Sequence, residues 1–338
     1  MTAASCDTIT ILRAHGRRLA KLIEPDETIV GYDSARTFDL TEQPVADLAA
    51  LRALLDRLLR QPDRCVVRGA IADPARTSGV RRLVHPDPQT GEVPTLIDVP
   101  RQWCALDIDG LDLPASVTGT DIFDCGIEAV MHLPQPFRGA AFIVQASASH
   151  GIKPGVRLRL WFWLSRPTGG TELRYWLRHT VADPSIFRAA QVIYTAAPVF
   201  ADGRADHLPR RIAEVPGVDQ VAVPPPEALQ PPPRPPAKEL PQQGDSRAAS
   251  YGFAALRNST MRIRCAQHPH RHDTIIRETC SLARLARAGL LPAGDIRRAV
   301  AEAAAHAGKP NDETDLAITW ALANPSTSPL PEGLHNGR

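Results

Sequence analysis

Short apolar segments, rich in β-branched and aromatic residues, recur through the first two thirds of the chain. Four of them, at 64–69, 103–109, 140–146 and 156–164, are each bounded by Gly or Pro. Segments of this length and composition are typical of β-strands. We therefore predict that these four segments form strands.

Three other segments carry apolar residues three and four positions apart. They are 9–23, 171–180 and 45–59, and the last has leucines at 48, 51, 54, 55, 58 and 59. This spacing predicts helices. Because strands and helices mix in one region, the pattern favours an α/β or α+β domain over a bundle or a sandwich.

A proline-rich stretch at 224–236 divides the chain, because repeated proline favours an extended spacer over helix or central strand. We predict a domain over 1–222, a linker over 223–246, a second domain over 247–325 and a flexible tail over 326–338.

The second domain is predicted to be a small all-α helical bundle. Three helices, at 273–288, 292–307 and 312–323, end at Gly289, at Gly308 and before Pro325. The residues predicted to face inward are Ile275, Ile276, Leu282, Leu285, Ile296, Val300, Leu316 and Ile318.

Composition narrows the possible functions only in part. The chain has 338 residues, 43% of them hydrophobic, and no apolar run approaches the roughly 20 residues of a membrane span. With no apolar signal-peptide core either, we expect a cytoplasmic protein. The six cysteines form no C-x-x-C pair, so no zinc ribbon is predicted. A net charge of +2 does not identify a nucleic-acid binder, but arginine clusters at 157–159, 210–211 and 257–271 leave that class open.

Asp107 and Asp109 are separated by one residue within a predicted strand. The period of two places both carboxylates on one face and turns Ile108 to the other. Paired carboxylates on a rigid support can hold divalent metal ions. The alternative is a strand that ends in a polar turn, where acids are common.

The segment 147–155 is a polar, glycine-containing connection between two predicted strands. It supplies hydroxyl groups, including that of Ser149, together with His150 and Lys153, which is a suitable set for phosphate. The strand that follows alternates Arg157 and Arg159 with apolar residues. Two arginines on a sheet face predict an anion or acids nearby, although a solvated outer face of a hairpin is the alternative.

A third acid, Asp183, lies in Val-Ala-Asp-Pro-Ser at 181–185. This residue is either a further acidic ligand or a residue that ends a helix before proline.

In their order, these features resemble the archaeo-eukaryotic primase superfamily, the primase-polymerases, and especially the compact primases of plasmids and phages. The hhhDhD strand of that family is matched by Asp107 and Asp109, its small-x-His element by 148–150, and its hydrophobic-Asp element by Asp183. The resemblance covers about 100–210. This sequence departs from the family in the second element. A Gly-Ile-Lys-Pro-Gly turn follows His150, and Arg159 takes the strand-opening position. His150 and Arg159 therefore both remain candidates for the phosphate contact.

The resemblance implies an α+β catalytic domain with a mixed sheet and a DNA primase that makes primers on single-stranded DNA from nucleoside triphosphates. Asp107, Asp109 and Asp183 would then ligate Mg²⁺ or Mn²⁺. Residues that would contact the nucleotide and its phosphates are Ser149, His150, Lys153, Arg157 and Arg159. The helical domain would grip template or initiating nucleotide, or serve only in structure or protein docking. Because no G-x-x-x-x-G-K-[ST] loop occurs, strand separation would come from a separate helicase.

Two other functions are compatible with the sequence. One is a non-catalytic protein that binds a replication origin or single-stranded DNA and whose acids are structural. The other is a metal-dependent or rolling-circle-type nuclease that uses His268 and His270, although the proline between these histidines argues against the strand that such enzymes use.

Overall fold

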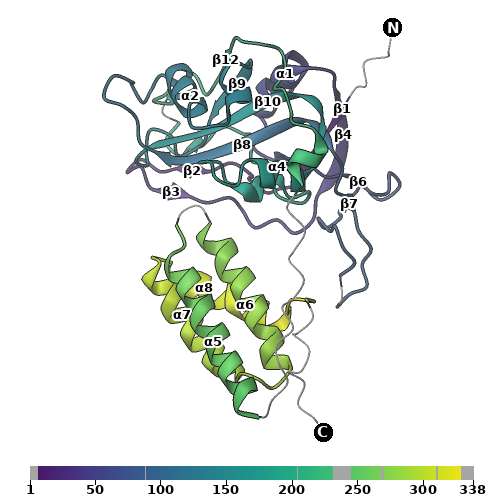
Figure 1. The fold of residues 1–338 in the computed structure, drawn as a ribbon. Helices are drawn as coiled ribbons and strands as arrows, with labels where there is room; N and C mark the ends of the chain where they lie inside the picture. Colours follow the sequence, from purple (N-terminus) through teal and green to yellow (C-terminus); the bar gives the residue numbers. More distant parts are fainter. Residues whose placement is uncertain are drawn as a thin grey trace. The chain divides into compact units, whose positions relative to one another are not determined.

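The chain separates into two compact units, Met1–Pro231 and Pro232–Arg338 (Figure 1). This computed structural model describes residues 7–87, 89–203, 205–230, 245–267, 270–309 and 311–328. Most of the predicted linker, 231–244, and the last ten residues of the predicted tail lie outside the described residues. Both units are described by themselves below.

The first unit is built around a four-stranded sheet in the order β12–β9–β10–β8. Its strands are β8 (Arg101–Leu111), β9 (Phe142–Ala146), β10 (Val156–Thr168) and β12 (Ile212–Val215). All three pairings are antiparallel. The prediction of a mixed sheet is therefore wrong for this sheet, because neighbouring strands such as β9 and β10 are joined by chain reversals and not by crossover helices.

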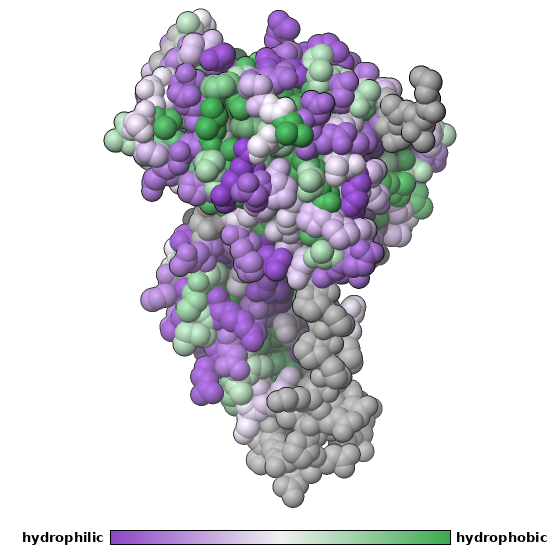
Figure 2. All heavy atoms as spheres, turned by 45° about the horizontal axis from the view of Figure 1, so that its top comes forward, coloured by the Kyte–Doolittle hydropathy of each residue, from purple (hydrophilic) through white to green (hydrophobic). Residues whose placement is uncertain are grey.

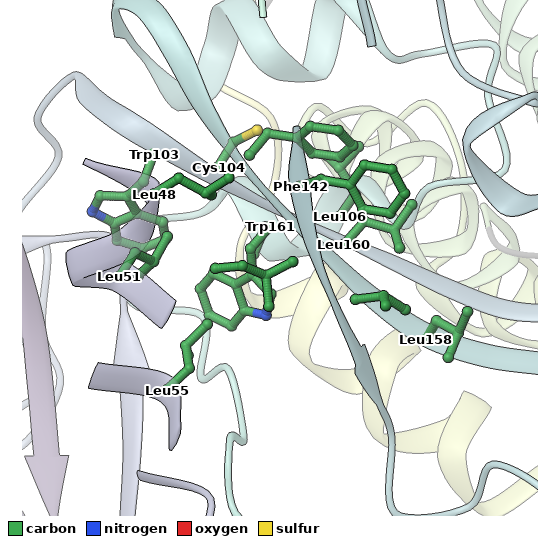
Figure 3. Close-up of a cluster of buried hydrophobic side chains, with 14 of the residues drawn as sticks. Leu48, Leu51, Leu55, Trp103, Cys104, Leu106, Phe142, Leu158, Leu160 and Trp161 are labelled. Carbon is green, nitrogen blue, oxygen red and sulfur yellow. The ribbon is translucent and has the colours of Figure 1, made fainter. Parts of the chain in front are cut away.

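Each face of the sheet is covered by a helix. On one face, Leu48, Leu51 and Leu55 of α1 (Leu48–Leu58) pack against Trp103 and Trp161 (Figure 3). On the other, α2 (Ile122–Val130) approaches closely because Gly126 has no side chain to separate it from β9. The two tryptophan rings lie 5.9 Å apart between their centroids. Burial on both faces explains why β8 and β10 are apolar along most of their length.

A second sheet, in the order β4–β1–β5, corrects the prediction of a helix over 9–23. Its strands are β1 (Asp7–Arg13), β4 (Asp39–Val45) and β5 (Arg64–Val67), all antiparallel. The segment 8–11 alternates threonine and isoleucine, and β-branched side chains fit a pleated surface better than a helix. The predicted helix at 45–59 corresponds to α1.

Two smaller sheets and several short elements complete the first unit. One sheet joins β2 (Leu22–Ile23), β3 (Ile29–Val30) and β11 (Val199–Phe200), with β11 parallel to β2. The other pairs β6 (Ala70–Ile71) with β7 (Leu96–Ile97). The remaining elements are α3 (Gln135–Arg138), α4 (Gly170–Trp176), and the 3-10 helices η1 (Pro184–Phe187) and η2 (Pro226–Leu229).

The described residues of the second unit form four helices with a hydrophobic core of their own. They are α5 (Asp245–Arg264), α6 (Arg271–Arg287), α7 (Ala293–His306) and α8 (Asn311–Ala323). Ile275, Leu282, Ile296, Val300 and Ile318 belong to this core.

Two predictions for the second unit need correction. Helix α5 had not been predicted. Leu316 had been predicted to face inward, but it is 76% exposed. The buried face of α8 runs through Thr314, Ala317, Ile318 and Ala321, and Leu316 lies off that stripe.

The surface and the helices say little about membranes. Figure 2 shows hydrophilic and hydrophobic side chains interspersed in small groups over the visible face of the first unit. Within the described residues, no helix combines the length and the apolarity needed to cross a bilayer.

Candidate active site

The two acids of the Asp-x-Asp motif lie directly opposite the two arginines of the neighbouring strand. The antiparallel register pairs Asp107 with Arg159 and Asp109 with Arg157. Residues so paired on one face have their Cβ atoms close together, which favours opposite charges. The ion pairs are 2.9 Å long between Arg159 Nη2 and Asp107 Oδ1, and 3.0 Å between Arg157 Nη1 and Asp109 Oδ1.

This charged cluster lies on the same sheet face as Trp103 and Trp161, toward the C-terminal end of β8 and the N-terminal end of β10. The side chain of Asp107 is 33% exposed and that of Asp109 is 49% exposed, whereas Arg159 is buried. Each carboxylate uses only its Oδ1 atom in the ion pair. The second oxygen of each acid therefore has capacity to accept another ligand.

Burial raises the pKa of Asp107 above its ordinary value. The negative charges of Asp109 and Asp183 act in the same direction, and Arg159 opposes them. Carboxylates this close repel one another, and a bound cation would relieve that repulsion.

Asp183 is next to this pair through the backbone. Its N–H donates to the carbonyl of Asp107 at 3.0 Å, and Ala182 forms a bridge with Ile108. Its carboxylate caps η1, where it accepts from the backbone and the hydroxyl of Ser185 at 2.8 and 2.9 Å. Asp183 thus begins a helix after the sheet edge, and its metal-binding role stays a prediction.

His150 and Ser149 are used inside the protein. His150 is 1% exposed; its Nδ1 accepts from the Arg157 backbone N–H at 3.1 Å, and its Nε2 lies 2.8 Å from the carbonyl of Gly119. These contacts define a neutral ring that donates through Nε2, and burial lowers the pKa of His150. Ser149 is also buried, and its carbonyl accepts a hydrogen bond from the backbone N–H of Lys153. Of the two candidates for the second element, Arg159 is the one beside the acids.

The connection 147–155 is held in place from the other side by Arg211. This buried side chain donates to both carboxylate oxygens of Asp206 and, at 2.9 Å, to the carbonyl of Ser147. His207 also lies 3.1 Å from the carbonyl of His150. The loop that presents Lys153 is therefore anchored at two points.

Glycines allow this loop to reach the end of the Asp-x-Asp strand. Gly110 and Gly155 both have positive φ, of 76° and 73°. A Cβ atom at Gly155 would lie 2.8 Å from the backbone of Gly110. Beside this contact the surface is hollowed by residues 150–156 together with Asp112, Leu113 and Gly119.

Three residues that the sequence analysis did not assign to the site adjoin the cluster. Tyr32 and Tyr194 are stacked with ring centroids 3.5 Å apart, and the ammonium of Lys21 lies 5.6 Å from the centroid of Tyr32. The carbonyl of Tyr194 accepts from Arg159 Nη1 at 2.6 Å. Lys21 had been placed in the mispredicted helix, and the tyrosines lie in irregular segments, so no periodic pattern could have indicated them.

The donor set is compatible with Mg²⁺ or Mn²⁺ in one respect and incomplete in another. Hard carboxylate oxygens with free acceptor capacity suit these ions. Within the described ranges, however, no three His, Cys, Asp or Glu side chains come together in a way that could hold a metal ion. Mg²⁺ is commonly bound by one or two carboxylates, with water and substrate phosphates completing the shell, so Asp107 and Asp109 fit such an ion.

Comparisons with known proteins give little beyond this geometry. No family model matches the chain, and no curated protein matches it. A solved structure titled "Crystal structure of primase RepB'" is similar over 94% of this chain and 90% of that chain, with 12% identical residues and a TM-score of 0.26. A likeness of that size carries no argument, and the functional case rests on the site itself.

Proposed function

We propose that this chain is a metal-dependent nucleotidyltransferase of the primase kind, which makes primers on single-stranded DNA from nucleoside triphosphates. The observation that supports it is the placing of two partly exposed carboxylates, Asp107 and Asp109, on one strand face among several cations. An enzyme that joins a hydroxyl to a nucleoside triphosphate needs both: acids for the metal and cations for the phosphates.

In this proposal Asp107 and Asp109 hold Mg²⁺ or Mn²⁺ through the oxygens that the arginines leave free, with Asp183 as a third acid nearby. When bound, the metal would activate the attacking 3′-hydroxyl and neutralise charge on the triphosphate. Arg157 and Arg159 hold the carboxylates in a fixed orientation through their ion pairs, and Lys153 contacts phosphate from the anchored loop.

The same ion pairs support one competing function. If Arg157 and Arg159 serve only to neutralise Asp107 and Asp109, the cluster is structural and the chain is a non-catalytic protein that binds an origin or single-stranded DNA. The nuclease hypothesis gains no such observation: His268 lies outside the described residues, and His270 stands at the start of α6 and not on a strand.

Primer synthesis with labelled nucleotides on single-stranded DNA, with Mn²⁺ or Mg²⁺, tests the proposal. The native chain should yield labelled oligonucleotides, Asp107→Ala should yield none, and Asp219→Ala, which alters an exposed acid elsewhere, should match the native chain. Circular dichroism would verify that the variants are folded. Activity retained by Asp107→Ala would refute the metal assignment. No product from any chain, combined with DNA binding that is unaffected by Mg²⁺, would favour the non-catalytic function.

The proposal includes partners. Because the sequence has no P-loop of the G-x-x-x-x-G-K-[ST] type, a separate helicase would expose the template. Unwinding of duplex DNA by the purified chain would contradict this part.

A further inference from the structure

Lysine is scarce in this chain, and two of its lysines belong to the candidate site. Only four of the 39 basic Lys and Arg residues are lysine: Lys21, Lys153, Lys238 and Lys309. Lys21 and Lys153 interact electrostatically with each other, and Lys21 also interacts with Asp107, Asp109 and Arg157. Lys238 lies outside the described residues.

The contacts that lead from Lys21 to the acids are continuous. Lys21 immediately precedes β2, and its carbonyl accepts from Val199 of β11 at 2.9 Å, which fixes its backbone. Its ammonium lies near the ring of Tyr32, which stacks on Tyr194. The carbonyl of Tyr194 accepts from Arg159, the partner of Asp107. Lys21 is therefore placed from the N-terminal part of the chain beside the acids of β8 and the arginines of β10.

The arginines of the site are held by the two carboxylates, although the buried Nε atoms of both arginines have no hydrogen-bond partner among the described residues, whereas no acid pairs with the lysines. Arg159 donates to Asp107 and Tyr194, and Arg157 donates to Asp109. Among the described residues, neither the ammonium of Lys21 nor that of Lys153 forms a hydrogen bond. Neither ammonium lies within 4 Å of a carboxylate oxygen. Burial, followed by the charges of Lys153 and Arg157, lowers the pKa of Lys21, while Asp109 and Asp107 act in the opposite direction, so an added anion would stabilise the Lys21 ammonium further.

We infer that Lys21 and Lys153 form a two-lysine clamp for the polyphosphate of a nucleoside triphosphate at the Asp107–Asp109 cluster. The inference rests on the proposed function for the identity of the nucleotide, and it adds Lys21 as a binding residue from outside the motif region. An ammonium is a compact charge on a flexible stem, which suits phosphates that shift during transfer, whereas the planar guanidinium of arginine suits the fixed carboxylates opposite.

Phosphate-directed lysine labelling tests the clamp without relying on catalysis. The aldehyde of pyridoxal 5′-phosphate condenses with a lysine amine and releases water, and borohydride reduces the resulting imine to a stable secondary amine. With four lysines in the chain, peptide mass spectrometry can follow each one separately. Lys21 and Lys153 should be labelled and should both be protected by inorganic triphosphate and by ATP, each with Mg²⁺. Lys309 should be labelled without protection.

The clamp would be refuted if Lys21 were not labelled, or if neither triphosphate nor ATP decreased its labelling. Protection by ATP alone would also overturn it, because it would show recognition of the nucleoside and not of the polyphosphate.

Variants of Lys21 supply a second readout. Lys21→Met keeps the length and the apolar stem but removes the charge, so it should weaken Mg²⁺–ATP binding at least about tenfold, the effect of losing one charge-assisted hydrogen bond. Lys21→Arg should recover part of that loss, and Lys309→Met should bind as the native chain does. Equal binding by native protein and Lys21→Met would refute the role of Lys21.

The clamp and the enzymatic function can fail separately. Primer synthesis that is unchanged by Lys21→Met would keep the proposed function and remove the clamp. Protection of Lys21 by triphosphate in a chain that makes no primers would keep the clamp and remove the proposed function.

Discussion

Two of the arginine–aspartate pairs in the first unit differ in how fully the protein uses the carboxylate. Asp206 accepts hydrogen bonds on both oxygens from Nε and Nη2 of Arg211, and Nη1 of Arg211 donates to the carbonyl of Ser147. Asp107 receives one from Arg159 on a single oxygen and keeps the other free. The first acid is saturated by the protein, and the second is left able to bind something else. A surplus of acceptor capacity, and not the presence of an ion pair, distinguishes the candidate site from a structural anchor.

The two acids also differ in pKa. Burial raises the pKa of both, but for Asp206 hydrogen bonds from Arg211 and the Leu208 backbone outweigh it and hold the pKa below its usual range. For Asp107 burial prevails and the pKa lies above it. Asp206 is therefore stabilised as an anion by its surroundings, while Asp107 is stabilised incompletely.

The largest expected effect comes from removing one charge at the unsaturated pair. Asp107→Asn and Asp109→Asn should each reduce primer synthesis by about a thousandfold or more, since the carboxylates would hold the metal that stabilises the transferring phosphates. Asp109 is half exposed, so Asp109→Asn should change the free energy of unfolding by less than about 1 kcal/mol. Rates from single-nucleotide incorporation and unfolding by urea would measure the two quantities. If these variants lost activity only because they were less stable, the proposed difference between the Asp107 and Asp206 pairs would be refuted.

For the Arg211–Asp206 pair we expect a substitution to lower the stability of the fold. Arg211→Met leaves Asp206 without its partner and releases the carbonyl of Ser147, so it should lower the free energy of unfolding by about 3–5 kcal/mol, as breaking a buried ion pair does. Urea titration would measure the change. Arg210→Met is the matched control, because the neighbouring Arg210 is 55% exposed and its contact with Asp121 is 3.8 Å long. Equal stability of the two variants would mean that Arg211 is not an anchor.

Local patterns in the sequence identified the acids of this comparison but not their pairing. The period of two placed Asp107 and Asp109 on one face, and it also placed Arg157 and Arg159 together. Which acid meets which arginine depends on the register between β8 and β10, a long-range property that neither strand encodes alone. His150 was selected by its position in a motif, and only the fold shows that both of its ring nitrogens are occupied.

Errors in the predicted elements have similar physical origins. Helix α2 was not predicted. It contains Gly126, a weak helix former whose small size is needed for packing against β9, so tertiary contact overrides propensity there. The segment 9–23 has apolar residues at helical spacing, yet sheet pairing to β4 and β5 decides its first half. That error removed Lys21 from consideration, because a residue placed on a surface helix has no reason to meet β8.

Binding of a divalent cation tests the free carboxylate oxygens of Asp107 and Asp109 and should have a smaller effect. If Asp107 and Asp109 bind Mn²⁺, a concentration ten times the dissociation constant should stabilise the native chain by about 1.4 kcal/mol through mass action. Thermal unfolding should then shift upward by a few degrees in the native chain and in Asp219→Ala, but not in Asp107→Asn. An equal shift in all three would place the bound ion elsewhere.

The smallest expected effect is a difference in pH dependence. Because the pKa of Asp206 is lower in the folded chain than in the unfolded chain, the unfolded state binds more protons as the pH falls below about the ordinary value for aspartate. The stabilisation that Asp206 provides is therefore fully present above its unfolded pKa and is lost as the pH falls through its folded pKa. Asp206→Asn should be less stable than the native chain near pH 6, and the gap should close on acidification. Urea titrations of both proteins from pH 6 downward would measure this, with the exposed Asp219→Asn as control. A stability gap that stays constant with pH would contradict this prediction. It would show that Asp206 contributes through its shape and hydrogen bonds, and that Arg211 does not specifically stabilise the charged carboxylate.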